Sequence, residues 1–156
     1  MLSQLNLRAL NGEVFPAAAL EGKSVLVVNV ASRCGLTPQY TGLVALRAAY
    51  AGRGVEVLGV PCNQFGKQEP GTPDEIQTFC ATKYGVDFPL LEKQDVNGAG
   101  RSPLYALLVG SEAGGGKDIS WNFEKFVIAP DGRVVARFAP TVEPGAPEVL
   151  AALGVA

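Results

Sequence analysis

The stretch of sequence that decides the fold is residues 24–43, which read SVLVVNVASRCGLTPQYTGL. Its β-branched apolar run, Ser24–Ala31, predicts a central strand that is buried on both faces of a sheet. Thr37 and Pro38 then predict a helix start, with Thr37 as the N-cap and Pro38 at the first helical position. Cys34 is therefore expected in the loop between a buried strand and the N-terminus of a helix.

The segments around this unit continue an alternation of strands and helices. Val55–Val60 predicts a second buried strand, parallel to the first across a βαβ crossover. Residues 72–84 predict a helix opened by a capping box. The Asn11-Gly12 dipeptide predicts a hairpin near the start of the chain. Further strands are predicted at Phe88–Leu91, Phe123–Ile128 and Arg133–Phe138, and further short helices at 102–108 and 147–153.

This order predicts an α/β protein with a thioredoxin-like fold, in which helices flank a central mixed β-sheet and an N-terminal β-hairpin is added. The length of 156 residues predicts one domain spanning 1–156. Apolar residues make up 47% and the net charge is -2, which excludes a disordered chain and argues against nucleic-acid binding. Neither a transmembrane segment nor a secretory signal is visible, so a cytoplasmic location is expected.

The chain contains no histidine and three cysteines, Cys34, Cys62 and Cys80. The absence of histidine excludes mechanisms that use imidazole as a base, an acid or a metal ligand. Three well-separated cysteines fit neither a disulfide framework nor a four-ligand metal site. We therefore expect no metal and no cofactor, and the thiols are either buried apolar groups or reactive ones.

Cys34 is the strongest candidate for chemistry. Unpaired N–H groups in the first turn of the following helix, together with Arg33, favour the thiolate, which is the nucleophilic form. A purely structural, buried cysteine is the competing interpretation. Thr37 stands where a thioredoxin has its second cysteine, so a general disulfide exchanger is disfavoured.

Several blocks of sequence resemble the glutathione peroxidase family. The segment that contains Cys34 looks like the active-site signature of that family, and the similarity runs over nearly the whole chain. Val60 departs from the family pattern, which usually has Phe there. The matching blocks are 29–40 (NVASRCGLTPQY), 61–71 (PCNQFGKQEPG), 95–98 (DVNG), 103–105 (PLY) and 121–126 (WNFEKF).

By this resemblance the catalytic tetrad is Cys34, Gln68, Trp121 and Asn122, whose indole and carboxamide groups replace an imidazole. Taken alone, Trp121 would be a core aromatic and the two amides would be exposed loop residues. The resemblance implies that Cys34 reduces hydrogen peroxide and organic or lipid hydroperoxides and becomes a sulfenic acid. Cys80 matches the resolving cysteine of the family.

Cys80 is expected on the apolar stripe of the helix over residues 72–84, so that local unwinding must bring it to Cys34. A merely packed Cys80 stays the alternative, and Cys62 is expected to be a bystander with a minor chance of resolving. The expected reductant is thioredoxin; glutathione as the reductant, or a redox relay to a partner protein, are the alternatives. The short stretch 105–119 lacks the insertion of tetrameric members, which favours a monomer.

Overall fold

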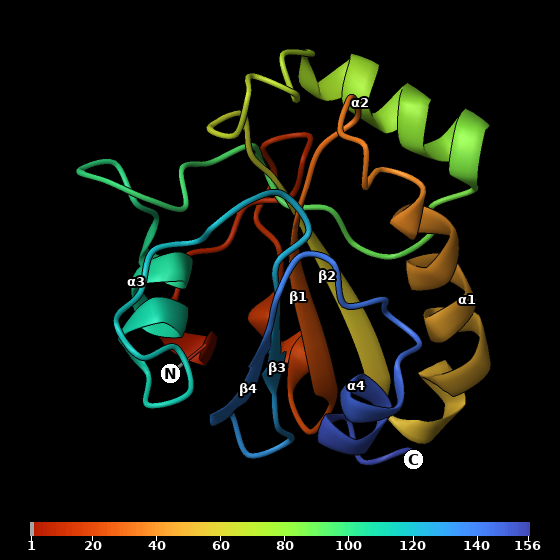
Figure 1. The fold of residues 1–156 in the computed structure, drawn as a ribbon, viewed down its shortest axis with the longest axis vertical. Helices are drawn as coiled ribbons and strands as arrows, with labels where there is room; N and C mark the ends of the chain where they lie inside the picture. Colours follow the sequence, from red (N-terminus) through yellow and green to blue (C-terminus); the bar gives the residue numbers. More distant parts are fainter. Residues whose placement is uncertain (1) are drawn as a thin grey trace.

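Four strands form one mixed sheet at the centre of the computed structural model, which describes residues 2–156 (Figure 1). β1 (Ser24–Val30) is parallel to β2 (Val55–Pro61) and antiparallel to β3 (Lys125–Ile128). β4 (Val134–Phe138) pairs antiparallel with β3, so the order across the sheet is β2-β1-β3-β4. The predicted mixed sheet with a parallel βαβ unit is confirmed.

Helices cover both faces of the sheet and enclose two apolar clusters. The cluster named here the α1-side core contains Leu26, Val28 and Val30 of β1 together with side chains of α1 (Gln39–Tyr50), α2 (Pro73–Phe79) and α4 (Pro147–Ala152). The α3-side core contains Val25 and Val27 of β1 together with α3 (Pro103–Gly110). Successive residues of a strand point to opposite faces, so the alternating valines and leucines of β1 fill both cores. The remaining elements are 3₁₀ turns at Leu2–Gln4, Ala17–Leu20 and Ala51–Arg53 and a π-helical turn at Cys80–Tyr84.

The N-terminal hairpin is present as a turn with very short arms. The Ala9 N–H donates to the Glu13 carbonyl (2.8 Å) and the Phe15 N–H donates to the Leu7 carbonyl (2.9 Å). Gly12 lies at φ +87°, the left-handed region that the turn requires. The pairing is limited to an isolated bridge between residues 8 and 14, so neither arm is a regular strand.

The strand predicted at Phe88–Leu91 is wrong as a regular element. Leu90 makes a single parallel bridge to Gly59, and Leu91 makes one antiparallel bridge to Ala9. Pro89 has no N–H group, so a regular ladder cannot continue through it. The segment extends the β2 side of the sheet by two backbone hydrogen bonds to Gly59, and Phe88, Leu90 and Leu91 are buried in the two cores.

The capping box predicted at Thr72 is confirmed. The Thr72 hydroxyl accepts from the Glu75 N–H at 3.2 Å, and the Glu75 carboxylate accepts from the Thr72 N–H at 3.0 Å. The turn around Gly132 and the closing helix are also confirmed. β3 begins at Lys125 rather than at Phe123, because Phe123 has a positive φ of +67°, which an extended strand cannot accommodate.

Candidate active site

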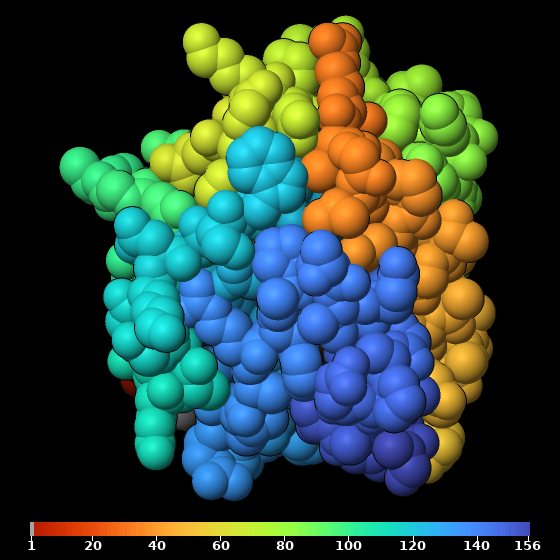
Figure 2. All heavy atoms as spheres, in the orientation of Figure 1, coloured from red at the N-terminus to blue at the C-terminus, as the bar shows by residue number. Residues whose placement is uncertain are grey.

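Three connecting segments meet at one end of the sheet. The loop with Cys34 follows β1 and the loop with Gln68 follows β2, and the two strands are parallel. The turn with Trp121 and Asn122 precedes β3, which is antiparallel to β1. The carboxyl ends of β1 and β2 and the amino end of β3 therefore lie at the same end of the sheet. Figure 2 shows the atoms around residue 120 (cyan) between those of the 30–40 loop (orange) and those of the 60–70 loop (yellow).

Thr37 holds the Cys34 loop in a tight turn and does not cap the helix. Its hydroxyl donates to the Ala31 carbonyl (2.8 Å) and accepts from the Cys34 N–H (2.9 Å). The Thr37 N–H donates in turn to the Cys34 carbonyl at 3.1 Å. The prediction of Thr37 as an N-cap is wrong, because the hydroxyl is used by the loop that precedes it. Helix α1 begins two residues later, at Gln39.

The Cys34 side chain is 8% exposed, and its sulfur accepts one hydrogen bond, from the Leu36 N–H at 3.3 Å. The sequence predicted unpaired N–H groups in the first turn of the helix. Instead, the N–H groups of Gln39, Tyr40 and Thr41 each donate to a carbonyl three residues earlier. That expectation is wrong because the chain enters the helix through successive tight turns, which pair these donors. The hydrogen bond that the Cys34 sulfur accepts therefore comes from its own turn, through the Leu36 N–H, and not from the N-terminus of the helix.

Gln68 and Asn122 are joined side chain to side chain. The Asn122 carboxamide donates from Nδ2 to Oε1 of Gln68 at 2.9 Å, and Asn122 is fully buried. The Gln68 carbonyl accepts from the Arg33 N–H at 3.0 Å, which ties the Gln68 loop to the residue beside Cys34. Asn122 is fully buried and Gln68 is half-buried, so neither amide is the exposed loop residue that the sequence alone suggested.

Trp121 is 38% exposed, which is unusual for a large apolar side chain in this protein. Its ring packs against Phe65, with ring centroids 5.7 Å apart. Its backbone carbonyl accepts from Nδ2 of Asn29 at 3.0 Å, and the Asn29 carbonyl accepts from the Phe123 N–H at 2.7 Å. Asn29 of β1 therefore fixes both ends of the Trp121–Asn122 turn.

Gly66 lies beneath the Gln68 and Trp121 side chains. A Cβ atom at this position would lie 3.3 Å from Cδ and Nε2 of Gln68 and 3.3 Å from Cη2 of Trp121. Gly66 also has a positive φ of +64°. Glycine is required here both for its backbone conformation and for the close approach of the two side chains.

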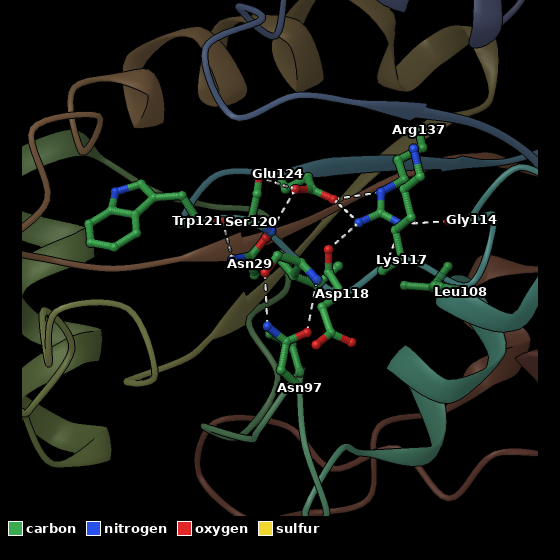
Figure 3. A network of polar contacts seen from close by, with 12 residues as sticks. Asn29, Asn97, Leu108, Gly114, Lys117, Asp118, Ser120, Trp121, Glu124 and Arg137 are labelled. Carbon is green, nitrogen blue, oxygen red and sulfur yellow. Dashed lines mark hydrogen bonds and ion pairs between the residues drawn. The ribbon is translucent and has the colours of Figure 1, made fainter.

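A partly buried polar network supports the segment that leads to Trp121, and the Trp121 ring projects away from it (Figure 3). Arg137 of β4 forms an ion pair with Glu124 and donates to the carbonyls of Gly114, Lys117 and Asp118. The Glu124 carboxylate accepts from both the N–H and the hydroxyl of Ser120, the residue before Trp121. A charged pair thus anchors the approach to the site from inside the protein.

Cys80 is fully buried and lies where α2 changes to a π-helical turn. Burial raises the pKa of its thiol to about 11, opposed by the neighbouring Tyr40 hydroxyl. Tyr40 is buried beside it, and burial and the Cys80 thiol raise the pKa of Tyr40 well above its usual value. A thiol in this environment is protonated and unreactive while the segment stays packed.

The three cysteines divide between the two cores. Cys34 and Cys80 both belong to the α1-side core, whereas Cys62 belongs to the α3-side core on the other face of the sheet. All three are reduced. Burial raises the pKa of the Cys62 thiol, which donates weakly to Oε1 of Gln64 at 3.6 Å. The sheet therefore separates Cys62 from the face that Cys34 and Cys80 share.

A cavity of about 200 Å³ lies between the Cys34 loop and α2. Ser32 and Arg33 line one side of it, and Ile76 and Phe79 line the other. Glu69, the residue after Gln68, also lines it; burial raises the pKa of this carboxyl, opposed by Ser32, Lys93 and Arg33. The helix that carries Cys80 is therefore incompletely packed against the loop that carries Cys34.

Within residues 2–156, no three side chains of the metal-binding types cluster in a way that could hold an ion. Nor does that part of the chain contain a helix long and apolar enough to cross a membrane. The predicted tetrad contributes a thiol, an indole N–H and two carboxamides at this end of the sheet. They can stabilise a thiolate and supply hydrogen bonds to an oxygen leaving group.

Sequence reasoning missed the residues that hold the site in place. Asn29 carried a usable signal, because it is the one polar residue inside the apolar run of β1. A second usable signal was the two consecutive charged residues, Glu124 and Lys125, at the start of a buried strand. Gly66 carried no sequence signal that distinguishes it from an ordinary turn glycine.

Comparisons with known proteins agree with this geometry. The sequence pattern described as glutathione peroxidase matches residues 2–109. The hydroperoxy fatty acid reductase Gpx2 of Synechocystis is 58% identical over 148 residues, covering 95% of this chain and 94% of that protein. The thioredoxin/glutathione peroxidase BtuE of Escherichia coli is 43% identical, covering 96% and 93% of the two chains. The crystal structure of Trgpx in its apo form superposes with a TM-score of 0.77 at 34% identity, covering 98% and 95%.

Proposed function

This chain belongs to the glutathione peroxidase family, and from that premise we propose that Cys34 is its peroxide-reacting thiol and Cys80 its resolving thiol. It is a thiol peroxidase that reduces hydroperoxides. The proposal adds to that activity the residues that perform each step, the reductant and the substrate range. One domain, residues 1–156, carries all of the steps.

In the first step the Cys34 thiolate attacks one oxygen of the hydroperoxide. An S–O bond forms, the O–O bond breaks, and the departing oxygen takes a proton and leaves as water or an alcohol. Trp121, Gln68 and Asn122 supply the hydrogen bonds that favour the thiolate and the departing oxygen. Support for these roles comes from the Asn122–Gln68 hydrogen bond of 2.9 Å and from the contacts of Gln68 and Trp121 over Gly66.

In the second step the Cys80 thiolate attacks the sulfur of the Cys34 sulfenic acid. An S–S bond forms, the S–O bond breaks and water leaves. The dithiol of thioredoxin then reduces the disulfide to two thiols and is itself oxidised to a disulfide. The observation that carries this assignment is the sharing of one core by Cys34 and Cys80 while Cys62 lies across the sheet.

The named relatives support the proposed substrate range, and thiol chemistry supports the proposed reductant. The Synechocystis relative is named for hydroperoxy fatty acids, which supports organic and lipid hydroperoxides beside hydrogen peroxide. The name of the Escherichia coli relative includes both thioredoxin and glutathione. We assign thioredoxin because an intramolecular disulfide is a substrate that a dithiol reduces in one exchange sequence. A cytoplasmic monomer, acting in a reducing compartment, completes the proposal.

Peptide mapping by mass spectrometry after one equivalent of peroxide tests the cysteine roles. The expected product is a Cys34–Cys80 disulfide with Cys62 free, whereas a Cys34–Cys62 disulfide would refute the assignment. NADPH oxidation should be fast with thioredoxin and its reductase and slow with glutathione and its reductase. Equal rates would refute the choice of reductant, and rapid single oxidation without turnover in either system would indicate a redox relay instead.

A further inference from the structure

Lys125 is a fully buried lysine at the start of β3, three residues after Asn122. Its Nζ donates to the Phe123 carbonyl at 2.6 Å and to the Pro140 carbonyl at 3.1 Å. None of the ion pairs formed within residues 2–156 includes Lys125. Glu143 and Glu124 are the acidic groups that favour its charged form, yet burial lowers the pKa of Lys125 to about 8. The ammonium group is thus buried against carbonyl oxygens rather than a carboxylate.

The backbone that Lys125 contacts is strained. Within residues 2–156, Lys67 (φ +52°) and Phe123 (φ +67°) are the non-glycine residues with positive φ. Each is the direct neighbour of a proposed tetrad residue, Gln68 in one case and Asn122 in the other. A bulky residue in this conformation is disfavoured and persists only where surrounding contacts enforce it. For Phe123 those contacts are the Asn29 carbonyl on its N–H and Lys125 on its own carbonyl.

The second partner of Lys125 connects the strained turn to the other half of the site. The Pro140 carbonyl also accepts from Nε2 of Gln39 at 2.8 Å. Gln39 is the first residue of α1 and follows the turn that holds Cys34. Lys125 therefore links Phe123, beside Asn122, to Pro140 and through it to the helix that begins next to Cys34.

We propose that Lys125 is a positioning residue of the peroxidase site, which holds the Phe123 carbonyl and thereby sets the Trp121–Asn122 turn against the Cys34 loop. The inference rests on the proposed function of these residues. Lys125 touches no reacting atom and acts only through Phe123 and Pro140. A buried ammonium without a carboxylate partner is costly to desolvate, so packing alone does not account for it. Its three N–H donors can satisfy carbonyls of two separate segments, which an apolar side chain cannot do.

The test uses Lys125→Met, which keeps an unbranched side chain one atom shorter than that of lysine and removes its donors. Lys23→Met is the matched control, because Lys23 is half-buried and immediately precedes β1, at the end of that strand opposite to Cys34. Trp121 is the single tryptophan of the chain, so its fluorescence reports on the turn directly. We expect Lys125→Met to shift the Trp121 emission and increase its quenching by acrylamide. The single-turnover rate of Cys34 oxidation should fall roughly ten- to a hundredfold, as expected for a misplaced catalytic group.

The two hypotheses fail in different ways. If the wild-type protein reduces no peroxide, the proposed function is wrong, while the Trp121 fluorescence still tests the role of Lys125. If Lys125→Met keeps both the wild-type emission and the wild-type oxidation rate, the positioning role is overturned. If Lys125→Met does not fold, the same measurements are made on Lys125→Leu, which has a shorter apolar side chain that also lacks donors. A wild-type rate and emission in that variant would overturn the role equally.

Discussion

The loop that carries Cys34 and the segment that carries Cys80 bury their cysteines almost equally but hold them by different means. The Cys34 loop is fixed by polar contacts, above all the Thr37 hydroxyl and the hydrogen bond between Arg33 and Gln68. The Cys80 segment is a π-helical turn whose next three residues, 81–83, are exposed. The Cys80 segment is held in place by the apolar packing of a few side chains beside a cavity.

Under the proposed function, this difference suits the separate tasks of the two regions. A site that must present hydrogen-bond donors to a peroxide needs a fixed geometry. A resolving thiol must instead leave its packed position, and a segment with few buried contacts opens at low free-energy cost. π-Helical turns within helices are found frequently at functional sites. The geometry of the reduced protein therefore suits a rigid first step and a mobile second one.

The largest effect that separates the two regions is expected for Cys80→Ser. Because Cys34 and its surroundings are untouched, one equivalent of peroxide should still be reduced at the wild-type rate. Turnover with thioredoxin should fall about a hundredfold or more, since the sulfenic acid has no internal partner. Stopped-flow oxidation and NADPH-coupled turnover measure the two steps. The control is Cys62→Ser, which should keep both; wild-type turnover in Cys80→Ser would show that the segment is not needed.

A change among the polar contacts around the Cys34 loop should have the opposite pattern. Asn122→Leu keeps the branched shape of the side chain and removes the donor on Oε1 of Gln68, so the carboxamide of Gln68 is no longer oriented. We expect the oxidation of Cys34 to slow roughly ten- to a hundredfold, while the reduction of a preformed Cys34–Cys80 disulfide by thioredoxin stays unchanged. Both rates are measured in single turnover, with Asn6→Leu, at an exposed site, as the control. Equal loss in both rates would mean that Asn122 is merely structural.

The pH dependence of disulfide formation tests whether the Cys80 segment opens before it reacts. Burial raises the pKa of Cys80 to about 11 while it is packed, whereas an exposed cysteine titrates at about 8.5. If opening comes first, the rate should rise about tenfold per pH unit and level off near pH 8.5. A continued rise toward pH 11 would show that Cys80 ionises in place. Rapid quench with an alkylating reagent, followed by mass spectrometry in Cys62→Ser, measures this rate.

The same pKa predicts a change in stability with a definite sign. A folded-state pKa above the exposed value means that the packed segment retains a proton that the opened segment loses. The stabilisation is complete below about pH 8.5 and is lost as the pH rises toward about 11. Amide hydrogen exchange of residues 80–84, corrected for the intrinsic pH dependence of exchange, should report this as easier opening at alkaline pH. Opening independent of pH would indicate that the thiol is already exposed.

The smallest expected effect is on global stability and concerns the rigid loop. Thr37→Val keeps the shape of the side chain but leaves the Ala31 carbonyl and the Cys34 N–H without their partner. We expect the free energy of unfolding in urea to fall by about 1–3 kcal/mol, the cost of unpaired buried polar groups. Thr41→Val, on the exposed face of α1, serves as the control and should cost much less. An unchanged free energy of unfolding would mean that water replaces the Thr37 hydroxyl.

Local patterns in the sequence predicted most of the elements and the positions of the site. The alternation around β1, the capping box at Thr72 and the turn at Gly132 depend on residues close together in the chain, so they could be read without a structure. Cys34 was chosen for its place between a buried strand and a helix, whereas the choice of Gln68, Trp121 and Asn122 came from the family resemblance. Those four assignments stay predictions until the variants are measured.

The three-dimensional arrangement of loops and strands decided what the sequence could not. Thr37 looks like a helix cap, and only the fold brings the Ala31 carbonyl close enough to take its hydroxyl. The separation of Cys62 from Cys34 and Cys80 depends on which face of the sheet each residue meets. Asn29 and Gly66 contact Trp121 from distant parts of the chain, and Lys125 contacts a strained turn and the Pro140 carbonyl of another segment. Local sequence propensities determine which elements form. Buried polar groups find their hydrogen-bond partners only when segments of the chain meet in the fold, so the contacts that support the site could be seen only in the tertiary structure.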